Sequence, residues 1–209
     1  MDVPARLDDQ LRARIERNLG AFARLDLARP GLVRAAVALT LVPGTDLEPA
    51  FLLTRRTVTL ARHSGQFALP GGRIDEGEDS TEAALRELHE ELGVALARER
   101  VIGLLDDFVT RSGYVITPVV VWGDDVGQLE PNPHEVAIAY RVALRELYRS
   151  DVPIIFRVDD CPAPGLALPL VGTEVYSPTA AIIFQLREVG LEGRATRVHH
   201  YEQPRFAWK

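Results

Sequence analysis

The chain has 209 residues, of which 46% are hydrophobic and 26% are charged. These values are typical of an ordinary globular domain and exclude disordered, collagen-like and coiled-coil proteins. The formal net charge of −6 argues against a protein that holds nucleic acid over a broad basic surface. Cys161 is the only cysteine, which excludes an internal disulfide and a cysteine-rich zinc site.

Two features of the sequence argue against a membrane or secreted protein. No apolar run approaches the length of a bilayer-spanning helix. The amino-terminal residues include Asp2, Asp8 and Asp9 and lack the apolar core of a secretory signal. We therefore expect a cytoplasmic location, with neither a membrane nor nucleic acid as a partner.

The first half of the chain predicts one helix, two strands and a long loop. Apolar residues recur at helical spacing over residues 5–24, so an amphipathic helix is expected there, covering the core of the same domain. Buried strands are predicted over residues 32–42 and 51–56. Residues 57–80 are rich in glycine and form a loop that is too long to be a simple connector.

The second half predicts alternating helices and strands. A helix is expected from Thr81, with Gly93 in the place of a C-terminal cap. The other expected elements are strands over residues 101–109, 114–122 and 136–142, helices over 144–148 and 179–189, and a partly strand-like tail from 194.

The proline-rich segment 151–177 is expected to be irregular. It would either wrap the surface or serve as a lid or dimer element, so a homodimer stays open. The whole pattern predicts a mixed α/β fold with a single domain over residues 31–192. Residues 1–30 would be an N-terminal helical extension, and residues 193–209 a C-terminal tail.

Three glutamates of the predicted helix carry the chemistry. Glu87, Glu90 and Glu91 stand at positions i, i+3 and i+4 and are expected to project from one patch opposite the leucine stripe. Like charges at this spacing repel unless a cation joins them, and hard oxygen ligands suit Mg²⁺ or Mn²⁺. Taken alone, the triplet favours a solvated acidic helix face. Gly71 and Gly72 let backbone groups approach a metal or phosphate closely, which tips the interpretation to a diphosphate site.

The residues from Gly72 to Val94 resemble the Nudix box. The spacing is Gly72, five residues, Glu78, seven residues, Arg86-Glu87-Leu88, one residue, Glu90-Glu91, one residue and Gly93-Val94, which matches every specified position. The resemblance implies a Nudix α/β/α sandwich with a mixed β-sheet between helices, covering at least residues 32–190. It also implies a hydrolase that cleaves a nucleoside diphosphate linked to another group, X.

The same resemblance implies a metal site within the box. Glu90 and Glu91 would be the principal ligands of Mg²⁺ or Mn²⁺, with Glu87 and the carbonyl oxygen of Gly71 as further ligands. The metal would neutralise the pyrophosphate, lower the pKa of a bound water and align that water for in-line attack at phosphorus.

Further residues receive roles from the resemblance. Glu78 and Arg86 would hold the carboxylates in place. The general base would be a box glutamate or an acid on a later loop, for which Glu135 and Glu130 are candidates. His89 stands at an unspecified position of the box and is expected to lie on the surface.

Residues 52–72 resemble the additional signature of the coenzyme A pyrophosphatase branch of this family. The positions that match are Leu52, Leu53, Thr54, Arg56, Gly65, Pro70, Gly71 and Gly72. The positions that depart are Thr57, Ala61 and Leu69, and Arg62 is displaced by one place from the signature arginine. The stretches 112–120 and 131–136 also resemble this branch.

The resemblance therefore implies Arg56, Arg62, Gly65 and Gly72 as substrate-binding residues. An arginine pair grips a phosphate dianion well, so Arg56 and Arg62 would bind the 3′-phosphate of coenzyme A. The first hypothesis is a metal-dependent pyrophosphatase that splits coenzyme A or an acyl-coenzyme A into 3′,5′-ADP and a 4′-phosphopantetheine.

Two other functions stay open. The missing signature arginine favours a Nudix hydrolase of ADP-ribose, NADH, a nucleotide sugar or a nucleoside triphosphate. A non-catalytic nucleotide-binding module is the remaining alternative, although the complete box is typical of active members.

Overall fold

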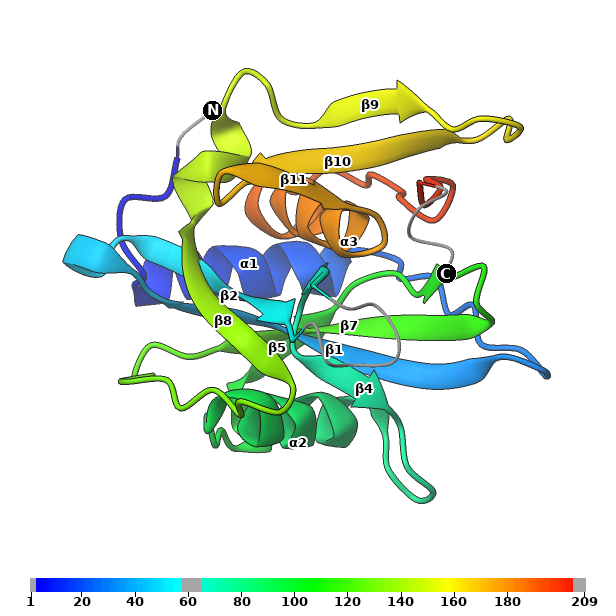
Figure 1. The fold of residues 1–209 in the computed structure, drawn as a ribbon. Helices are drawn as coiled ribbons and strands as arrows, with labels where there is room; N and C mark the ends of the chain where they lie inside the picture. The colour runs from blue at the N-terminus through cyan, green and yellow to red at the C-terminus, as the bar shows by residue number, and fades with distance from the viewer. Residues whose placement is uncertain (1–2, 58–64, 205–209) are drawn as a thin grey trace.

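The computed structural model describes residues 3–57 and 65–204 of the chain. Among these residues, a mixed eight-stranded sheet forms the centre of the protein (Figure 1). Its strands are β1 (Val33–Pro43), β2 (Pro49–Arg56), β3 (Phe67–Ala68), β4 (Gly71–Arg73), β5 (Val101–Leu104), β6 (Phe108–Val109), β7 (Tyr114–Trp122) and β8 (Val136–Ala143). β1 pairs in parallel with β7, and the other pairings are antiparallel, so the mixed sheet that the sequence predicts is confirmed.

Helices cover both faces of this sheet (Figure 1). α2 (Ser80–Leu92) packs on one face, whereas α1 (Asp9–Ala21) and α3 (Thr179–Gln185) pack on the other. Short helical turns complete the chain: η1 (Thr45–Leu47), η2 (Arg98–Arg100), η3 (Leu144–Tyr148) and, directly after α3, the wider turn η4 (Leu186–Leu191). The predicted α/β/α sandwich is therefore present.

The alternation of side chains along β1 explains why two separate cores form. Ala36 and Ala38 point to the face under α2, whereas Leu39 and Leu41 point to the face under α1 and α3. A strand that is buried on both faces appears in the sequence as a nearly continuous apolar run. The small side chains on the α2 face let this helix approach the sheet closely.

The N-terminal helix is part of the main core, as the sequence predicts. The side chain of Asp8 caps α1 by accepting a hydrogen bond from the backbone N–H of Leu11 at 2.9 Å. Ile15 and Leu19 are buried in the same apolar cluster as the sheet and α3. The helix comes so close to β5 that a Cβ atom at Gly103 would lie 2.7 Å from the side chain of Leu19.

Two strands lie in a segment that the sequence predicts as a loop. β1 and β2 pair only near the turn between them, at residues 41–43 and 49–51, and then diverge. The chain crosses the opening between them, because β3 pairs with β2 and β4 pairs with β1. This crossing places Gly71 and Gly72 beside α2 and thus positions the candidate site.

The expectation of an irregular segment over 151–177 is wrong. β9 (Ile154–Arg157), β10 (Pro164–Leu170) and β11 (Thr173–Tyr176) form a three-stranded antiparallel sheet outside α3 (Figure 1). Pro164 begins β10, and Pro169 lies beyond the part of β10 that pairs with β9, so neither proline has to donate to that ladder. Proline content alone therefore misled the interpretation.

The predicted strand over residues 101–109 is interrupted for a physical reason. Between β5 and β6 the chain turns Asp106 and Asp107 inward, where both are almost completely buried. Asp106 accepts hydrogen bonds from the backbone N–H of Leu25, from Arg197 and from Gln185, at 2.7, 2.6 and 2.8 Å. Asp107 accepts from Arg24, the backbone N–H of Leu27 and Thr117. This acidic pair joins the N-terminal segment, the sheet, α3 and the tail.

The remaining expectations differ little from the structure. Helical structure over 179–189 continues as η4 to Leu191. In the described part of the tail, residues 194–204, strand character is limited to one β-bridge between Gly165 and Glu202. No helix within residues 3–57 and 65–204 is both long and apolar enough to cross a membrane.

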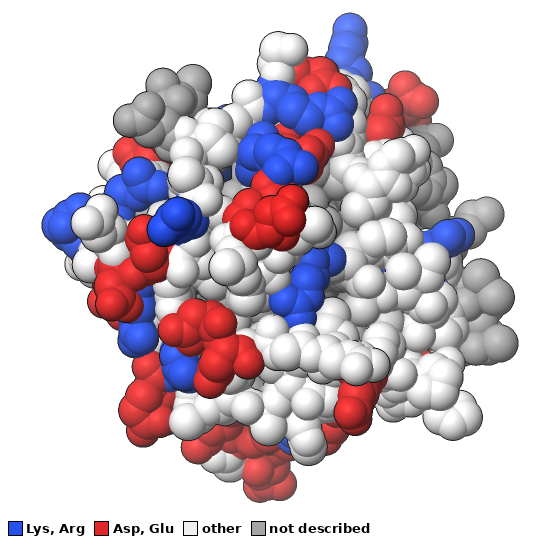
Figure 2. All heavy atoms as spheres, turned by 90° about the vertical axis from the view of Figure 1, so that its left-hand side faces the viewer, with Lys and Arg blue, Asp and Glu red and all other residues white. Residues whose placement is uncertain are grey.

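Acidic and basic side chains alternate on the end of the molecule that carries the β1–β2 turn (Figure 2). Several arginines there are paired with carboxylates, for example Arg145 with Glu48 and Arg100 with Asp124 and Asp125. On this face, the described residues form a mixed surface rather than a continuous basic one, in line with the net charge.

We expect Asp106→Ala to lower the free energy of unfolding by about 3 to 5 kcal/mol, because the change leaves Arg197, Gln185 and a backbone N–H without their acceptor. Urea-induced unfolding measures this loss. Asp124→Ala is the control, because its partner Arg100 is at the surface, and it should cost less than about 1 kcal/mol. Equal losses in the two variants would contradict the structural role assigned to Asp106.

Candidate active site

Local signals fix both ends of α2, the helix that carries the glutamates. The side chain of Asp79 accepts hydrogen bonds from the backbone N–H groups of Thr81 and Glu82, and the Glu82 side chain accepts from the backbone N–H of Asp79. This capping box starts the helix. Gly93 ends it in the left-handed conformation at φ 70°, so the predicted cap is confirmed.

Arg86 joins the acidic residues of the site. Its guanidinium donates to Glu78 at 2.8 Å, to Glu87 at 2.9 Å and to Glu90 at 3.2 Å. The hydrogen bond from Arg86 also holds the pKa of the Glu78 carboxyl below its usual range. Glu78 in turn accepts from the backbone N–H of Asp75, which fixes the loop before the helix. Arg86 and Glu78 thus lie where a positioning role requires them.

Glu91 departs from the expectation that all three glutamates face outward. Its side chain is only 2% exposed, because it points to the edge of the sheet beside β4. The backbone N–H of Gly71 approaches its Oε1 at 3.5 Å, and Nη1 of Arg56 lies 3.7 Å from the same atom. Burial raises the pKa of Glu91 to about 7, although the charge of Arg56 opposes this shift.

Glu87 lies between the buried and the exposed glutamate. Its side chain is 14% exposed, whereas that of Glu90 is 52% exposed. Burial also raises the pKa of Glu87, against the opposing effect of the hydrogen bond from Arg86. A Cβ atom at Gly72 would lie 2.1 Å from Oε1 of Glu87, so any other residue at this position would displace the Glu87 carboxylate.

The donor set fits a hard divalent cation, although Arg86 fills part of the space. Within residues 3–57 and 65–204, no three His, Cys, Asp or Glu side chains already converge on one point that could hold a metal ion. Instead, Arg86 itself donates hydrogen bonds to Glu87 and Glu90. Two carboxylates with raised pKa values beside a third are nevertheless the set that Mg²⁺ or Mn²⁺ would stabilise.

The backbone of Gly71 also faces this donor set. The N–H of Ala38 bonds to the carbonyl of Pro70, so the next pair in the ladder, Val37 with Gly71, is not hydrogen-bonded. In such a pair the N–H and carbonyl groups both point away from the neighbouring strand. The carbonyl oxygen of Gly71 is therefore available as the further ligand that the sequence resemblance implies.

The two candidate bases lie in different places. Glu135 is half-buried, and its charge contributes to the raised pKa values of both Glu87 and Glu91, so it lies near them. Glu130 is exposed beyond the C-terminal end of α2, where it packs against Gly93. His89 is exposed on the helix, as expected. The structure thus brings Glu135, and not Glu130, to the glutamates.

A cavity of about 780 Å³ opens beside the two glycines of the box. Arg56, Gly71 and Gly72 line it, together with residues that the sequence did not single out. They include Phe67 of β3, Arg73 of β4, Tyr114 of β7, Ile182 of α3 and Gln203 of the tail. Of the expected substrate-binding residues, Gly65 lies outside the wall of this cavity, and Arg62 lies outside the described residues.

Arg73 and Tyr114 are the pair that the sequence interpretation missed. Nη2 of Arg73 donates to the Tyr114 hydroxyl at 2.9 Å, and the guanidinium carbon lies 5.7 Å from the ring centre. Arg73 follows Gly72 directly, so its place within the box could have indicated that it lies at the site. Its carbonyl oxygen accepts a hydrogen bond from Arg86. Tyr114 stands on a strand far along the chain, and only the parallel pairing of β1 with β7 brings it close.

An α/β/α sandwich with a glycine loop, an acid-rich helix and an adjoining cavity defines the architecture of the Nudix class. The family model for the NUDIX domain matches residues 32–157, and the chain therefore belongs to the Nudix family. Members of this family generally depend on a divalent metal.

Curated relatives support this assignment. The uncharacterized Nudix hydrolase NudL of Photorhabdus laumondii is 41% identical over 100 residues, which are 47% of this chain and 54% of that protein. NudL of Cronobacter sakazakii is 36% identical over 134 residues, 61% of this chain and 70% of that protein. Nudix hydrolase 3 of Caenorhabditis elegans is 36% identical over 117 residues, 54% and 48% of the two chains. The chain thus spans about half the length of two of these three relatives.

A solved structure supports the fold. The MutT/nudix family protein from Enterococcus faecalis superposes with a TM-score of 0.56 at 17% identity. The match covers 78% of this chain and 63% of that one.

The burial of Glu91 predicts a pH dependence of stability in the metal-free protein. The carboxyl ionises near its ordinary value of 4.5 in the unfolded chain and only at about 7 in the folded one, so the folded state binds more protons between these values. The free energy of unfolding should therefore fall, by on the order of 2 to 3 kcal/mol, as pH rises through this window.

Urea-induced unfolding in the presence of EDTA at pH 5 and pH 8 measures this dependence. Glu91→Gln should flatten it and should be more stable than the parent at pH 8, because the neutral amide has no charge to desolvate. Glu90→Gln is the matched control and should keep the parental slope, since Glu90 is half exposed. The same slope in the parent and in Glu91→Gln would rule out this burial effect.

The two glycines should respond differently to alanine. A Cβ atom at Gly71 would lie 2.4 Å from the backbone oxygen of Ala36, so Gly71→Ala should lower the free energy of unfolding by about 2 kcal/mol or more. At Gly72 the Cβ atom meets only the mobile end of Glu87. Gly72→Ala should therefore keep most of the stability and weaken Mn²⁺ binding, which calorimetry and unfolding curves measure separately. Parental Mn²⁺ affinity in Gly72→Ala would contradict the placement of Glu87.

Proposed function

We propose that the protein is a divalent-metal-dependent pyrophosphatase that hydrolyses a nucleoside diphosphate linked to a second group. The observation that carries this proposal is the buried carboxylate of Glu91, held beside Glu87, a glycine backbone and Arg56. A buried acidic cluster is costly unless a cation compensates it. A pyrophosphate brings such cations with it and needs a facing arginine.

Each residue of the site has a distinct part in this reaction. Glu87, Glu90 and Glu91, with the carbonyl oxygen of Gly71, would hold the metal. When bound, the divalent cation would neutralise charge on the pyrophosphate and favour ionisation of the attacking water. Arg86, supported by Glu78, keeps Glu87 and Glu90 oriented. Arg56 lines the cavity beside Gly71 and Gly72 and would bind an oxygen of the diphosphate.

We assign the general base to Glu135. It is half-buried near Glu87 and Glu91, and the backbone N–H of Thr57 donates to its carbonyl oxygen at 3.0 Å, which ties this loop to the end of β2. A carboxylate in this position accepts the proton that the attacking water loses. Glu130 would not reach the same point, because it lies past the far end of α2.

The substrate that we propose is coenzyme A or an acyl-coenzyme A, cleaved to 3′,5′-ADP and a 4′-phosphopantetheine. Support comes from the partial match of residues 52–72 to the coenzyme A signature and from a cavity of about 780 Å³, a size that suits a nucleotide. Arg56 approaches Glu91 and thus belongs with the diphosphate. Because Arg56 lies close to Glu91, we do not assign it to the 3′-phosphate of coenzyme A, which is the role that the sequence resemblance implies for it.

A second substrate class is favoured by a specific observation. Ala61 stands where the signature has its second arginine, and Leu69 stands where it has an aromatic residue. These departures would suit ADP-ribose, NADH, a nucleotide sugar or a nucleoside triphosphate.

Mass spectrometry of the products distinguishes these substrates. The purified protein is incubated with Mg²⁺ or Mn²⁺ and with coenzyme A, ADP-ribose, NADH or a nucleotide sugar at one concentration. We expect 3′,5′-ADP and 4′-phosphopantetheine to be the dominant products. Cleavage of another diphosphate while coenzyme A stays intact would refute coenzyme A as the substrate and support the proposed type of reaction.

Glu90→Gln and Glu91→Gln should each lower kcat by about 100-fold or more, because each change removes a metal ligand and its charge. Circular dichroism should show an unchanged fold. Glu130→Gln, an exposed acid next to the helix, is the matched control and should keep parental turnover. A near-parental kcat in Glu91→Gln would contradict the assignment of Glu91 as a metal ligand.

A further inference from the structure

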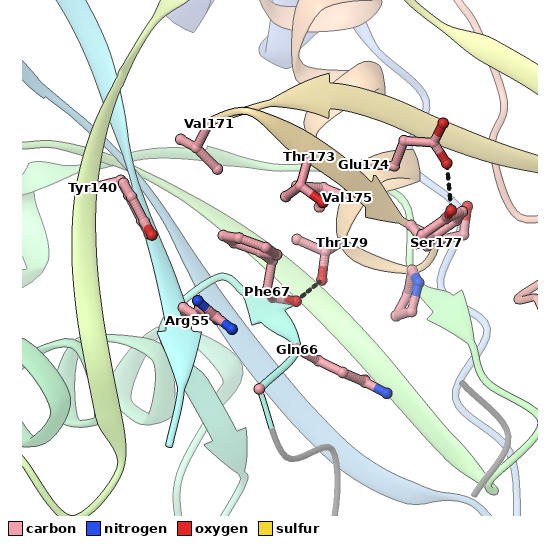
Figure 3. Close-up of a pocket in the computed structure, with 13 residues that line it drawn as sticks. Arg55, Gln66, Phe67, Tyr140, Val171, Thr173, Glu174, Val175, Ser177 and Thr179 are labelled. Atoms are coloured by element: carbon pink, nitrogen blue, oxygen red, sulfur yellow. Dashed lines mark hydrogen bonds between the residues drawn. The ribbon is translucent and has the colours of Figure 1, made fainter. Parts of the chain in front are cut away.

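Two neighbouring arginines of β2 point to opposite faces of the sheet. Side chains alternate along a strand, and Leu52 belongs to the core under α2 whereas Leu53 belongs to the core under α1 and α3. Arg56 follows the first of these faces and reaches Glu91. Arg55 follows the second face and points into a separate cavity of about 400 Å³ (Figure 3).

The walls of this cavity, which we call the Arg55 cavity, come from strands β2, β3, β8 and β11 and from the start of α3. Phe67 of β3 and Tyr140 of β8 form an aromatic side, with ring centres 5.9 Å apart. Thr173 and Val175 of β11 face them from the second sheet (Figure 3). β11 lies beyond residue 157, where the match to the NUDIX family model ends.

In the part of the chain that the structure describes, the guanidinium of Arg55 has no carboxylate partner and is available to a ligand anion. Among the described residues, no Asp or Glu oxygen lies within 4.0 Å of it, although many other arginines of this chain are paired. The acid in the wall, Glu174, accepts a hydrogen bond from the Tyr176 hydroxyl. This bond raises the pKa of Tyr176 to about 12, so the phenol keeps its proton and stays bound to Glu174.

The Arg55 cavity adjoins the larger cavity at the box. Gln66, Phe67, Pro178 and Thr179 line both. Thr179 donates to the carbonyl of Phe67 at 3.3 Å, so β3 and the start of α3 form a fixed partition between the two. A ligand that places its diphosphate at Arg56 and Gly71 can extend around Phe67 and reach Arg55.

We propose that the Arg55 cavity binds a phosphate monoester on the ribose of the diphosphate substrate. The proposal rests on the proposed hydrolase function and assigns to Arg55 the discrimination between phosphorylated and unphosphorylated nucleosides. A planar guanidinium binds two oxygens of such a dianion, and the Thr173 hydroxyl can donate a third hydrogen bond. Phe67 and Tyr140 offer aromatic surface to the adjoining base.

Matched pairs of substrates test this role. Coenzyme A is compared with 3′-dephospho-coenzyme A, and NADPH with NADH, so the two arms separate a 3′-phosphate from a 2′-phosphate. In at least one pair, we expect the parent to prefer the phosphorylated member in kcat/KM. Arg55→Gln should reduce this preference by about tenfold to 100-fold, through KM, and leave kcat for the unphosphorylated member unchanged.

Two further variants separate charge from structure. Arg55→Lys should keep part of the preference, because the positive charge stays and the two-pronged geometry is lost. Arg157→Gln is the matched control, since Arg157 is an exposed strand arginine of β9, and it should behave as the parent. An equal loss on both members of each pair in Arg55→Gln, or no preference in the parent, would overturn the proposal.

A binding measurement keeps this test independent of hydrolysis. Calorimetry in EDTA compares 3′,5′-ADP and 2′,5′-ADP with 5′-AMP. The parent should bind one of the two bisphosphates about tenfold or more tightly than 5′-AMP. Arg55→Gln should bind that bisphosphate and 5′-AMP about equally. Preferential binding of a bisphosphate without turnover of any substrate would refute the proposed hydrolase activity and support the proposed phosphate subsite. Equal affinities in the parent would refute the subsite, whatever the hydrolysis assay gives.

Discussion

The burial of the Glu91 carboxylate is the constraint on which the rest of the site depends. Removing a carboxylate from water costs free energy unless a cation or hydrogen-bond donors compensate it. Burial raises the pKa of Glu91 to about 7, and among the described residues only a long contact from the Gly71 N–H and an arginine at 3.7 Å oppose this shift. The fold therefore holds this carboxylate at a cost in desolvation free energy that a bound divalent cation would offset. Packing of α2 against the small side chains of β1 supplies the free energy that keeps it there.

The divergence of β1 and β2 makes this burial possible. Because the two strands pair only near their turn, the chain between β3 and β4 crosses the gap and brings two glycines against α2. Neither glycine has room for a Cβ atom, one because of the Ala36 backbone and the other because of Glu87. The approach of the strand to the helix thus excludes water from one side of the glutamates, and Arg86 orders the other side. Backbone geometry and side-chain charge act on the same three carboxylates.

The parts that the sequence could predict are those that local signals determine. The caps of α2, the apolar stripe and the spacing of the glutamates all lie within one short stretch, so the helix and its donors were predictable. The inward turn of Asp106 was not, because its partners Leu25, Gln185 and Arg197 lie far away in the sequence. The second sheet was missed because its prolines occupy positions that need no donor. The depth of Glu91 depends on β4, whose pairing with β1 no local pattern indicates.

The alternation along β2 links the catalytic proposal to the specificity proposal. Arg55 and Arg56 are adjacent in sequence, yet side chains alternate along a strand, so in our proposals one residue step would separate the diphosphate from the ribose phosphate. The box side of this arrangement lies inside the region that matches the family model, and the β10–β11 side of the Arg55 cavity lies outside it. Substitutions in β11 would therefore change the selectivity for the end of the substrate that lies far from the diphosphate, without affecting the metal ligands. The stretches that resemble the box and the coenzyme A branch lie between residues 52 and 136, whereas β11 lies at residues 173–176, so in our proposal part of the substrate selectivity comes from a strand that the resemblance does not include.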